Sequence, residues 1–521
     1  MGRVIENNIK PLDLDADLEA EDADSAGDDV ADVANAKSFA TQHRDRLKYC
    51  ALLGGWLIWQ EKYWAVDPDD QVMKFAILTA RSLFADVGAA TDLERRKTAF
   101  KAYAYANRRT GLRAMIDLAR HMLAVSADVF DRDPFALNCL NGTLDLRMSK
   151  LRAHDPADCI TKLIELDYDP QAGAPRWLTF LAEVLRDGAL ISYVQRAIGY
   201  SVTGDQRAEC MFVAVGDGAN GKGVFFDLIR EAIGPYGSTG RPELLIRQRF
   251  DDNKNNEDVA MLRGRRLVEV SETGERHELN EEQTKNLTGR DKVKASMKYE
   301  SLREWDPTHH IWLRTNNKPI IRGTEYAIWR RLKLILFIVK FKYASERAAL
   351  IKSGKARKDD PLLRVRNDGL RDALRKELPG ILAWVVKGAA LWWNGGKPDL
   401  REPKIVTDAV EEYRSEMDRL SQFIDECCDL TAGEPTLTRV LYAGYKTWAL
   451  EKGWKPWADN TFGQRLGKAG FKAVKIGTKN GREGLRLKPW DPAADNAVQN
   501  TEENLKAMSA KVRGAQRTPR S

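Results

Sequence analysis

The sequence predicts an α/β fold, a sheet covered by helices, at the centre of a multidomain chain of 521 residues. Three observations lead to this prediction. Between Cys210 and Val339 short β-type runs alternate with longer helical stretches, as strands and crossover helices do. A glycine-rich turn joins one of these runs, Met211 to Val215, directly to a helix that begins near Lys222. The length itself predicts three or four compact units at roughly 150 residues per domain.

Composition narrows the class of protein. The chain is 43% hydrophobic and 31% charged. Its longest apolar runs, such as Leu334 to Val339, are far shorter than the roughly 18 residues of a membrane span. The first residues lack a secretory signal, so we expect a cytoplasmic protein with no membrane partner. Six scattered cysteines without a CxxC pair, and six histidines, predict neither a disulfide framework nor a zinc cluster.

Charge is distributed unevenly along the chain. The net charge is +7, but the first 40 residues carry 11 acidic and 3 basic side chains, so the remaining 481 residues hold +15. An acidic tail on a basic body is typical of a protein that meets nucleic acid. A surplus of this size is equally compatible with ordinary solubility charge.

The N-terminal half divides into three predicted segments. Residues 1–36, rich in Asp and Ala, are predicted to be an acidic disordered tail. Residues 37–130 have helical apolar spacing and carry Trp56, Trp59 and Trp64, which we expect in a core. Residues 131–205 combine the turn dipeptide Asn141-Gly142 with short strand-like runs and a helix from Trp177 to Leu185.

The C-terminal half is predicted to contain four segments. The α/β core at 206–345 is followed by a helical region at 346–415 that closes it. Residues 416–490 read as three short helices and a β-ribbon with Asn480-Gly481 at its tip, a layout that fits a winged-helix-like DNA-binding domain. Residues 491–521 are polar and predicted to be a disordered tail.

The glycine-rich turn has the spacing of a phosphate-binding loop, which predicts ATP as the cofactor. Glycine backbone N–H groups can close around phosphate oxygens, the following helix N-terminus adds positive potential, and Lys222 supplies a charge for the β- and γ-phosphates. The alternative is a glycine-rich turn with a chance lysine. Gly223 departs from the pattern, since Ser or Thr there would offer a hydroxyl to Mg²⁺. The predicted ATP-binding residues are Gly216, Asp217, Gly218, Ala219, Asn220, Gly221, Lys222 and Gly223.

Two further strands end in polar residues. The strand from Arg266 to Ser271 presents Glu272 at its carboxyl end, where α/β sheets bind ligands, so Glu272 is the candidate Mg²⁺ ligand and activator of the attacking water. Glu269, inside the strand, and Glu275, beyond its end, are less well placed. The strand from His310 to Thr315 ends in Asn316, which could hydrogen-bond the γ-phosphate. The alternatives are a solvated acidic turn and an ordinary turn asparagine.

Together these motifs resemble a known family. The run VGDGANGKG, then RRLVEVSETGE, LTGRDKVKASMKYE and HIWLRTNNKPIIRGTEYAIWRRLKLILF, resembles the superfamily 3 helicase domain of phage and plasmid primase-helicase proteins, a group similar to the poxvirus primase-helicase. The resemblance covers roughly residues 40 to 490. It identifies 131–205 as the linking domain of that family. Ser296 departs from it, because many members carry arginine there.

The resemblance implies an AAA+-type ATPase that works as a ring, a homo-hexamer, moving 3′ to 5′ on single-stranded DNA. Lys222 would bind phosphate, Glu272 would organise Mg²⁺ and water, and Asn316 would sense the γ-phosphate. Arg330 or Arg331 would reach the ATP of a neighbouring subunit as an arginine finger. Both arginines also have a plain interpretation, as surface charges between a helix and a strand.

The segment Arg290 to Tyr299 would be the hairpin that enters the ring channel. Lys292, Lys294 and Lys298 have even spacing and share one face of a strand, which suits tracking of DNA phosphates. Tyr299 could stack on a base. The alternative is a solvated lysine face.

We therefore expect a replicative DNA helicase of a phage, prophage or plasmid in a bacterial host, acting on single-stranded and forked duplex DNA. No primase active site is recognised, so another protein, a primase or an initiator, could act beside it. The rival hypothesis is an ATP-controlled DNA-binding initiator or scaffold with little unwinding activity, which Gly223 favours. A small-molecule kinase is disfavoured, because the sequence indicates no second substrate pocket.

Overall fold

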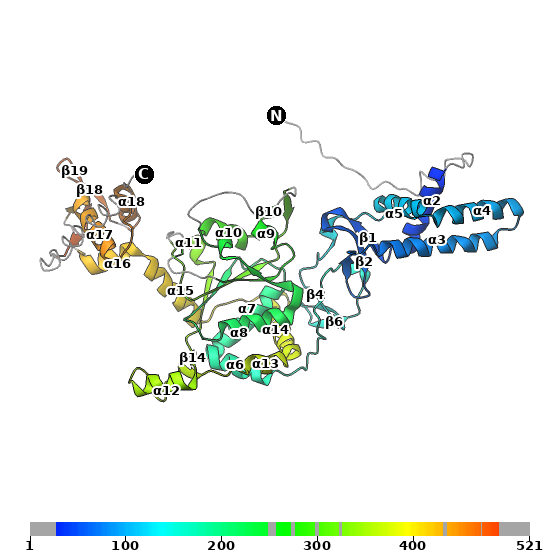
Figure 1. The fold of residues 1–521 in the computed structure, drawn as a ribbon. Coiled ribbons are helices and arrows are strands. Elements are labelled where there is room, and N and C mark those ends of the chain that lie inside the picture. The colour runs from blue at the N-terminus through cyan, green and yellow to red at the C-terminus, as the bar shows by residue number, and fades with distance from the viewer. Residues whose placement is uncertain are drawn as a thin grey trace, which may run out of the picture. The chain divides into compact units, whose positions relative to one another are not determined.

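The computed structural model describes residues 28–247, 257–271, 277–296, 302–321, 326–430, 435–469 and 471–488 (Figure 1). The chain divides into two compact units. The first unit comprises Met1–Glu275, Glu282–Asn317 and Ile335–Pro403, and the second comprises Arg276–Glu281, Lys318–Leu334 and Lys404–Ser521.

The first unit begins with a helical layer that starts earlier than predicted. Helix α2 begins at Asp28, so the prediction of a disordered tail is wrong for residues 28–36, and residues 1–27 lie outside the described chain. The reason is burial, since Ala36 and Phe39 of α2 join a core with Met115 and Ala119. The helices of this layer are α2 (Asp28–His43), α3 (Val72–Ala89), α4 (Leu93–Ala106) and α5 (Arg109–Met122).

A small antiparallel sheet also lies in the region predicted to be only helical. Its strands are β1 (Leu47–Cys50), β2 (Gly55–Trp59) and β3 (Trp64–Val66). Tyr49 pairs with Trp56, so these residues belong to strands and the helical prediction is wrong here. Trp56 and Trp64 are 8% and 1% exposed, which confirms their expected place in the core, whereas Trp59 is only half-buried.

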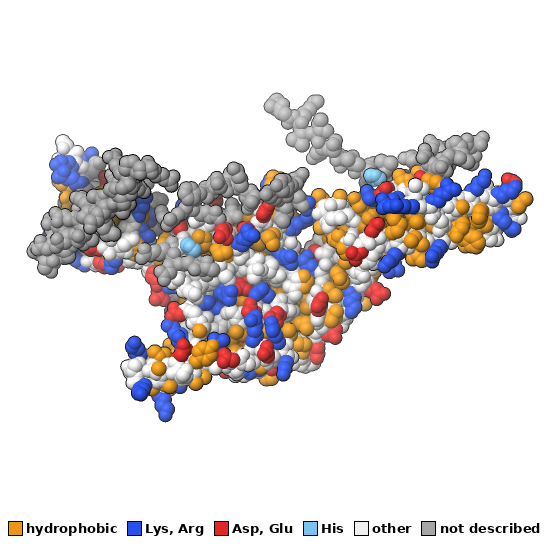
Figure 2. Space-filling view, in the orientation of Figure 1, with side chains coloured by type: hydrophobic (Ala, Val, Ile, Leu, Met, Phe, Trp, Pro, Cys, Tyr) orange, Lys and Arg blue, Asp and Glu red, His pale blue; other side chains and the backbone are white. Residues whose placement is uncertain are grey.

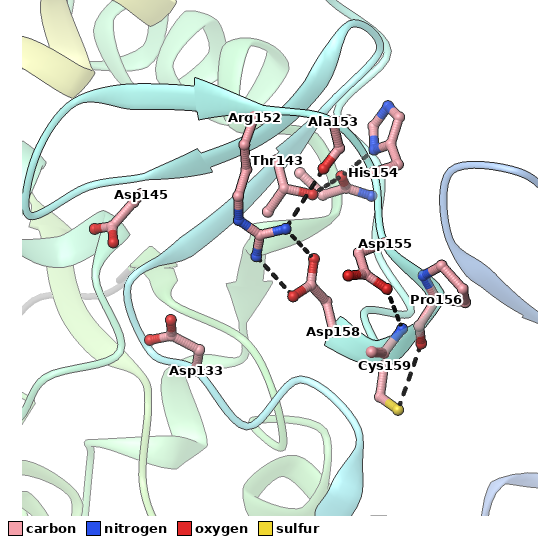
Figure 3. A network of polar contacts seen from close by, with 12 residues as sticks. Asp133, Thr143, Asp145, Arg152, Ala153, His154, Asp155, Pro156, Asp158 and Cys159 are labelled. Carbon is pink, nitrogen blue, oxygen red and sulfur yellow. Dashed lines mark hydrogen bonds and ion pairs between the residues drawn. The ribbon is translucent and has the colours of Figure 1, made fainter.

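A second small sheet follows, with the predicted turn at its centre. Its strands are β4 (Ala136–Cys139), β5 (Gly142–Asp145) and β6 (Lys150–Arg152). Asn141-Gly142 lies between β4 and β5, as predicted, and Cys139 pairs with Gly142. At the end of β6, two guanidinium nitrogens of Arg152 donate to the Asp158 carboxylate at 2.6 and 2.7 Å (Figure 3). The Asp155 side chain accepts a hydrogen bond from the Ala157 N–H at 2.8 Å. These contacts fix the loop that leaves the sheet.

The central sheet confirms the α/β prediction. It has five strands in the order β13-β7-β12-β9-β8, and β7, β12, β9 and β8 run parallel to their neighbours. Figure 1 shows helices packed against this sheet. Its strands are β7 (Met211–Val215), β8 (Gly237–Gly240), β9 (Leu267–Ser271), β12 (His310–Thr315) and β13 (Leu332–Leu336). Every residue of β7 is buried, as expected for a strand covered on both faces.

Three of the helices beside the sheet meet around Trp177 of α6. Its ring stacks on Phe225 of α8 at 5.5 Å and meets Trp384 of α14 edge-on at 5.6 Å. Helices α7 and α14 cross at Gly199 and Gly388. A Cβ atom on Gly199 would lie 2.0 Å from the Ala389 nitrogen, so only glycine permits this approach. The helices of this region of the chain are α6 (Pro175–Leu185), α7 (Gly188–Val202), α8 (Lys222–Ile233), α9 (Glu257–Ala260), α10 (Glu281–Thr288), α13 (Leu370–Arg375) and α14 (Leu378–Trp393).

Shorter elements complete the first unit. Strands β10 (Val293–Ala295) and β11 (Arg303–Trp305) form an antiparallel pair, and β14 (Lys340–Lys342) and β15 (Leu363–Val365) form a parallel pair beside helix α12 (Ala344–Lys352). Ion pairs join α13 to α8, between Arg371 and Asp227 and between Arg375 and Glu231, the latter at 2.8 Å.

The second unit contains a helical core and short strands. Phe423, Tyr445, Trp448 and Phe462 are its central buried rings. Its helices are α11 (Tyr326–Trp329), α15 (Lys404–Met417), α16 (Arg419–Cys427), α17 (Thr438–Glu451) and α18 (Asp459–Lys468), and its strands are β16 (Cys428–Asp429), β17 (Pro435–Leu437), β18 (Ala473–Ile476), β19 (Lys479–Glu483) and β20 (Arg486–Leu487).

The ribbon of the second unit turns at a different place from the one predicted. Ile476 pairs with Lys479, so the turn residues are Gly477 and Thr478, and Asn480 and Gly481 lie inside β19. Gly477 has φ +61°, the left-handed value that a tight turn needs. Gly481 is needed for space instead, because a Cβ there would lie 2.6 Å from the Ile476 side chain.

The helices in the described parts of the chain are all too short or too polar to cross a lipid bilayer.

Candidate nucleotide-binding site

The predicted phosphate loop lies where β7 ends at the sheet edge. The chain leaves the sheet after Val215 and α8 begins at Lys222, as the spacing predicts. Gly221 has φ +88°, and a Cβ there would lie 2.7 Å from a Val184 methyl group. The loop therefore needs glycine at this position both for its backbone conformation and for its closeness to α6.

The segment between β13 and β14 braces this loop. The Phe337 N–H donates to Val215 O and the Phe341 N–H donates to Ala219 O, both at 2.7 Å. The Asn220 side-chain amide donates to Phe337 O at 3.2 Å. Asp217 forms an ion pair with Lys340, which holds the pKa of Asp217 below its ordinary value. The carboxylate in the loop is thus partly neutralised.

Lys222 is a buried lysine beside Asn316. Its side chain belongs to a residue only 4% exposed, and its ammonium group donates to Gly216 O and, at 3.3 Å, to the Asn316 side-chain oxygen. Burial, aided by the charge of Arg314, lowers the pKa of Lys222 to about 8. The structure therefore brings together two of the residues that the sequence nominated, from α8 and from the end of β12.

A charge cluster around the buried Glu269, which the sequence did not predict as a cluster, lies next to this lysine. Glu269 of β9, 1% exposed, pairs with Arg314 of β12 at 2.7 Å and with Arg230 of α8 at 2.9 Å. Arg314 also donates to the Ser271 hydroxyl at 2.7 Å. The only signal in the sequence was a single Glu or Arg among mainly apolar residues in each of the two strands, and this pattern does not identify the partner.

Mg²⁺ prefers oxygen ligands, and the described residues around the loop do not form a set that fits it. Gly223 has no hydroxyl, and a Cβ there would lie 3.1 Å from Arg314 Nη1, so the position faces a cation. No three His, Cys, Asp or Glu side chains gather as a metal site within the described residues. Glu272, the predicted Mg²⁺ ligand, follows Ser271 directly but lies outside the described residues.

Arg330 and Arg331 follow α11 in the second unit. Arg330 is exposed, and its backbone N–H donates to Tyr326 O at 3.0 Å. Arg331 is half-buried and donates from Nη1 to Ala327 O, also at 3.0 Å. The two arginines therefore differ in accessibility, with Arg330 the more exposed.

The predicted DNA hairpin is the pair β10–β11. Lys292 and Lys294 are exposed, while Val293 and Ala295 between and after them are buried, so the two lysines share the outer face. Lys294 pairs with Glu304 of β11 at 3.2 Å. Lys298 and Tyr299 lie outside the described residues.

A cavity of about 1160 Å³ lies at the base of this hairpin. Lys292 lines it together with Arg132, Arg263 and Arg265, and Asp128 and Asp158 lie on its walls as well. The mixed charges of these walls define no single ligand.

Basic and apolar side chains also meet on the N-terminal helices. Phe84, Leu93 and Phe100 are each more than half exposed. Figure 2 shows orange and blue side chains interleaved over α3 and α4, where Arg96 and Lys101 rim a small groove with Phe100. A surface of exposed rings and cations is chemically suited to single-stranded nucleic acid.

Comparison with known families matches two parts of the chain. The family model described as D5 N terminal like matches residues 36–186, and the model described as Poxvirus D5 protein-like matches residues 415–508. These matches flank the sheet and its phosphate loop. The two matches show that the chain is similar to poxvirus D5-type proteins, and the resemblance inferred from the sequence is confirmed.

Individual relatives come from large DNA viruses. A protein of Acanthamoeba polyphaga mimivirus, named "putative helicase", is 26% identical over 301 residues, which is 57% of this chain and 31% of the relative. A "putative helicase" of Invertebrate iridescent virus 6 is 24% identical, covering 57% of this chain and 32% of the relative. A "putative primase" of African swine fever virus is 24% identical with coverage of 57% and 31%. The chain thus spans about a third of the length of these relatives.

Among solved structures, the apo NrS-1 C-terminal region is 10% identical, with a TM-score of 0.37 and coverage of 61% of this chain and 79% of that one. The virus relatives infect eukaryotes, so they give no support to the expected phage or plasmid origin or to a bacterial host.

Proposed function

We propose that this chain is an ATP-dependent DNA helicase of a replication system. The observation that carries the proposal is the glycine-closed loop between β7 and α8, with the buried Lys222 at its end and Asn316 of the neighbouring strand 3.3 Å from its ammonium group. A buried ammonium group at a helix N-terminus suits the phosphates of a nucleotide. The relatives named helicase point to the same activity.

Each nominated residue has a role in this proposal. Lys222 and the backbone of residues 216–223 bind the ATP phosphates, Asn316 senses the γ-phosphate, and Glu272 acts on the attacking water. Arg330 is the favoured finger toward a neighbouring subunit in a hexameric ring, because it is the more exposed of the two arginines. Lys292 and Lys294, with Lys298 and Tyr299, follow single-stranded DNA in the 3′ to 5′ direction.

The architecture supports the finer assignment. The parallel sheet with a phosphate loop after β7 has the parts of an AAA+-type core. In the second unit, helices α16, α17 and α18 with the β18–β19 ribbon have the parts of a winged-helix-like domain. We assign DNA binding to that domain.

One experiment tests the proposal. Steady-state ATP hydrolysis is measured with and without single-stranded DNA, beside strand displacement on a forked duplex. We expect DNA-stimulated hydrolysis and displacement of the strand. ATP binding with neither hydrolysis nor unwinding would instead support the second candidate, an ATP-controlled initiator or scaffold, which the missing hydroxyl at Gly223 favours.

The ring is tested by mixing two inactive variants. Lys222→Ala subunits supply an intact Arg330, and Arg330→Ala subunits supply an intact phosphate loop. If the finger acts in trans, mixed rings regain part of the hydrolysis, because some interfaces combine both intact partners. The same mixture made with Arg331→Ala decides between the two arginines. A monomer by light scattering with ATP and DNA present would contradict the ring.

A further inference from the structure

Arg314 is placed beside the phosphate loop by contacts that leave one of its nitrogens directed at Gly223. Its Nε contacts Glu269 at 2.7 Å, and its Nη2 donates to the Ser271 hydroxyl at 2.7 Å. Nη1 is the atom that a Cβ on Gly223 would meet at 3.1 Å. The side chain is 31% exposed, so the guanidinium remains open to a ligand.

A side chain at position 223 would compete with the Arg314 guanidinium for the same space. A serine or threonine after Lys222 would place its Cβ against Nη1 at a distance tighter than most van der Waals contacts, so a hydroxyl and this guanidinium do not fit together without a shift. At this position the loop therefore has the Arg314 guanidinium beside it and no hydroxyl that could hold a metal ion.

We propose that Arg314 contacts the phosphates of the bound nucleotide from within the same subunit, through the space that Gly223 leaves open beside Lys222. This inference rests on the proposed ATP site. Arginine offers five N–H donors in a planar fork, and charge-assisted hydrogen bonds to phosphate are among the strong ones in proteins. Arg314 thereby supplies part of the charge neutralisation that a hydroxyl-held metal ion supplies in loops with serine or threonine.

Arg314 can turn toward a phosphate without leaving Glu269 unpaired. Glu269 has a second cationic partner, Arg230, at 2.9 Å, so its buried carboxylate stays paired when Arg314 turns part of its fork toward a phosphate. The Arg314 charge also acts on the loop, because together with burial it lowers the pKa of Lys222.

The test is a titration of the full-length protein with ATP, once with Mg²⁺ and once with EDTA, with the dissociation constant as the readout. We expect the wild-type protein to bind ATP in EDTA. Arg314→Gln should weaken ATP binding in EDTA by about 10-fold or more, as loss of a hydrogen bond to a charged group does. The matched control is Arg147→Gln, which removes a guanidinium of similar exposure, 34%, that pairs with Asp133 outside the Glu269 cluster, and it should leave both dissociation constants unchanged.

A second variant keeps the test decisive if Arg314→Gln fails to fold, as judged by circular dichroism. Glu269→Gln removes the carboxylate that holds Arg314, and it should tighten ATP binding in EDTA relative to binding with Mg²⁺. If Arg314→Gln folds and its ATP binding in EDTA is unchanged, the proposed role of Arg314 is overturned. If Arg314→Gln does not fold, unchanged ATP binding of Glu269→Gln in EDTA overturns it. That result leaves the proposed function intact if Lys222→Ala still weakens ATP binding by at least about 100-fold. Absence of ATP binding by the wild-type protein in both conditions overturns the ATP site and this inference together.

Discussion

The phosphate loop and the β10–β11 hairpin both present lysines, but they present them in opposite environments. Lys222 is 4% exposed and held by Gly216 O and Asn316, whereas the Lys294 side chain is 61% exposed. A charge in a poorly solvated site interacts strongly with its partners, while water and salt screen a charge on the surface. We infer that nucleotide binding at the loop depends mainly on Lys222, whereas DNA binding at the hairpin depends on several lysines together.

The largest effect should come from Lys222→Ala. The substitution removes the buried ammonium group and leaves the loop backbone in place, so ATP affinity should fall by at least about 100-fold, in line with a lost charged hydrogen bond in a poorly solvated site. Isothermal titration calorimetry measures this loss, and Lys387→Ala, an exposed lysine of α14, is the control. Equal affinities for the two variants would remove the contrast between the loop and the surface.

The next effect concerns chemistry rather than binding. Glu272→Gln keeps the shape of the side chain and removes its charge, so ATP should still bind while hydrolysis falls by about 10²-fold or more, as expected for a lost general base. A phosphate-release assay under saturating ATP measures the rate. Normal turnover would identify Glu272 as a solvated turn residue.

A smaller effect is expected in the pH dependence of ATP binding, which distinguishes the buried Lys222 from the exposed lysines of the hairpin. The pKa of Lys222 is lowered to about 8 in the nucleotide-free protein, so above that pH the lysine loses its proton. ATP favours the charged form, so binding must then be accompanied by proton uptake. The affinity should therefore be about twofold lower at pH 8 than near pH 7 and then fall more steeply, by at most about tenfold per pH unit. Lys222→Ala should lack this slope, and a flat wild-type profile up to pH 9.5 would contradict the shift.

The smallest single-site effects are expected at the hairpin. Replacing Lys292 and Lys294 by alanine should weaken single-stranded DNA binding several-fold at low salt. It should also reduce the slope of log K against log salt by about 0.7 per lysine. Fluorescence anisotropy at several salt concentrations measures both. Alanines at Lys355 and Lys358, exposed after α12, are the matched control, and an equal change of slope in that control would show that any two surface lysines suffice.

Sequence reasoning found the features that depend on spacing along the chain. The loop from Gly216 to Lys222 and the polar end of β12 at Asn316 follow from a strand, a turn and a helix in order. The structure joins them with a 3.3 Å contact. The strands β1 to β3 escaped prediction because runs of three to five residues are too short for their periodicity to stand out from helical spacing.

Other features depend on contacts that no local pattern encodes. Gly477-Thr478 and Asn480-Gly481 are both plausible turns. The choice is made by pairing of β19 with β17 on its other side, where Leu437 lies opposite Gly481. The cluster of Glu269, Arg230 and Arg314 joins two strands and a helix, and each member alone reads as an isolated charge.

The crossing of α7 and α14 has a mechanical consequence. Where Gly199 meets Gly388 the two backbones touch directly, with no side chain that could change rotamer and absorb a displacement. A displacement of α7 is therefore expected to displace α14 as well. The ion pairs between α13 and α8 link α13 to the helix that begins at the phosphate loop. We infer that α7 and α14 move together as one body, so a displacement at the phosphate loop would reach both ends of this helix pair.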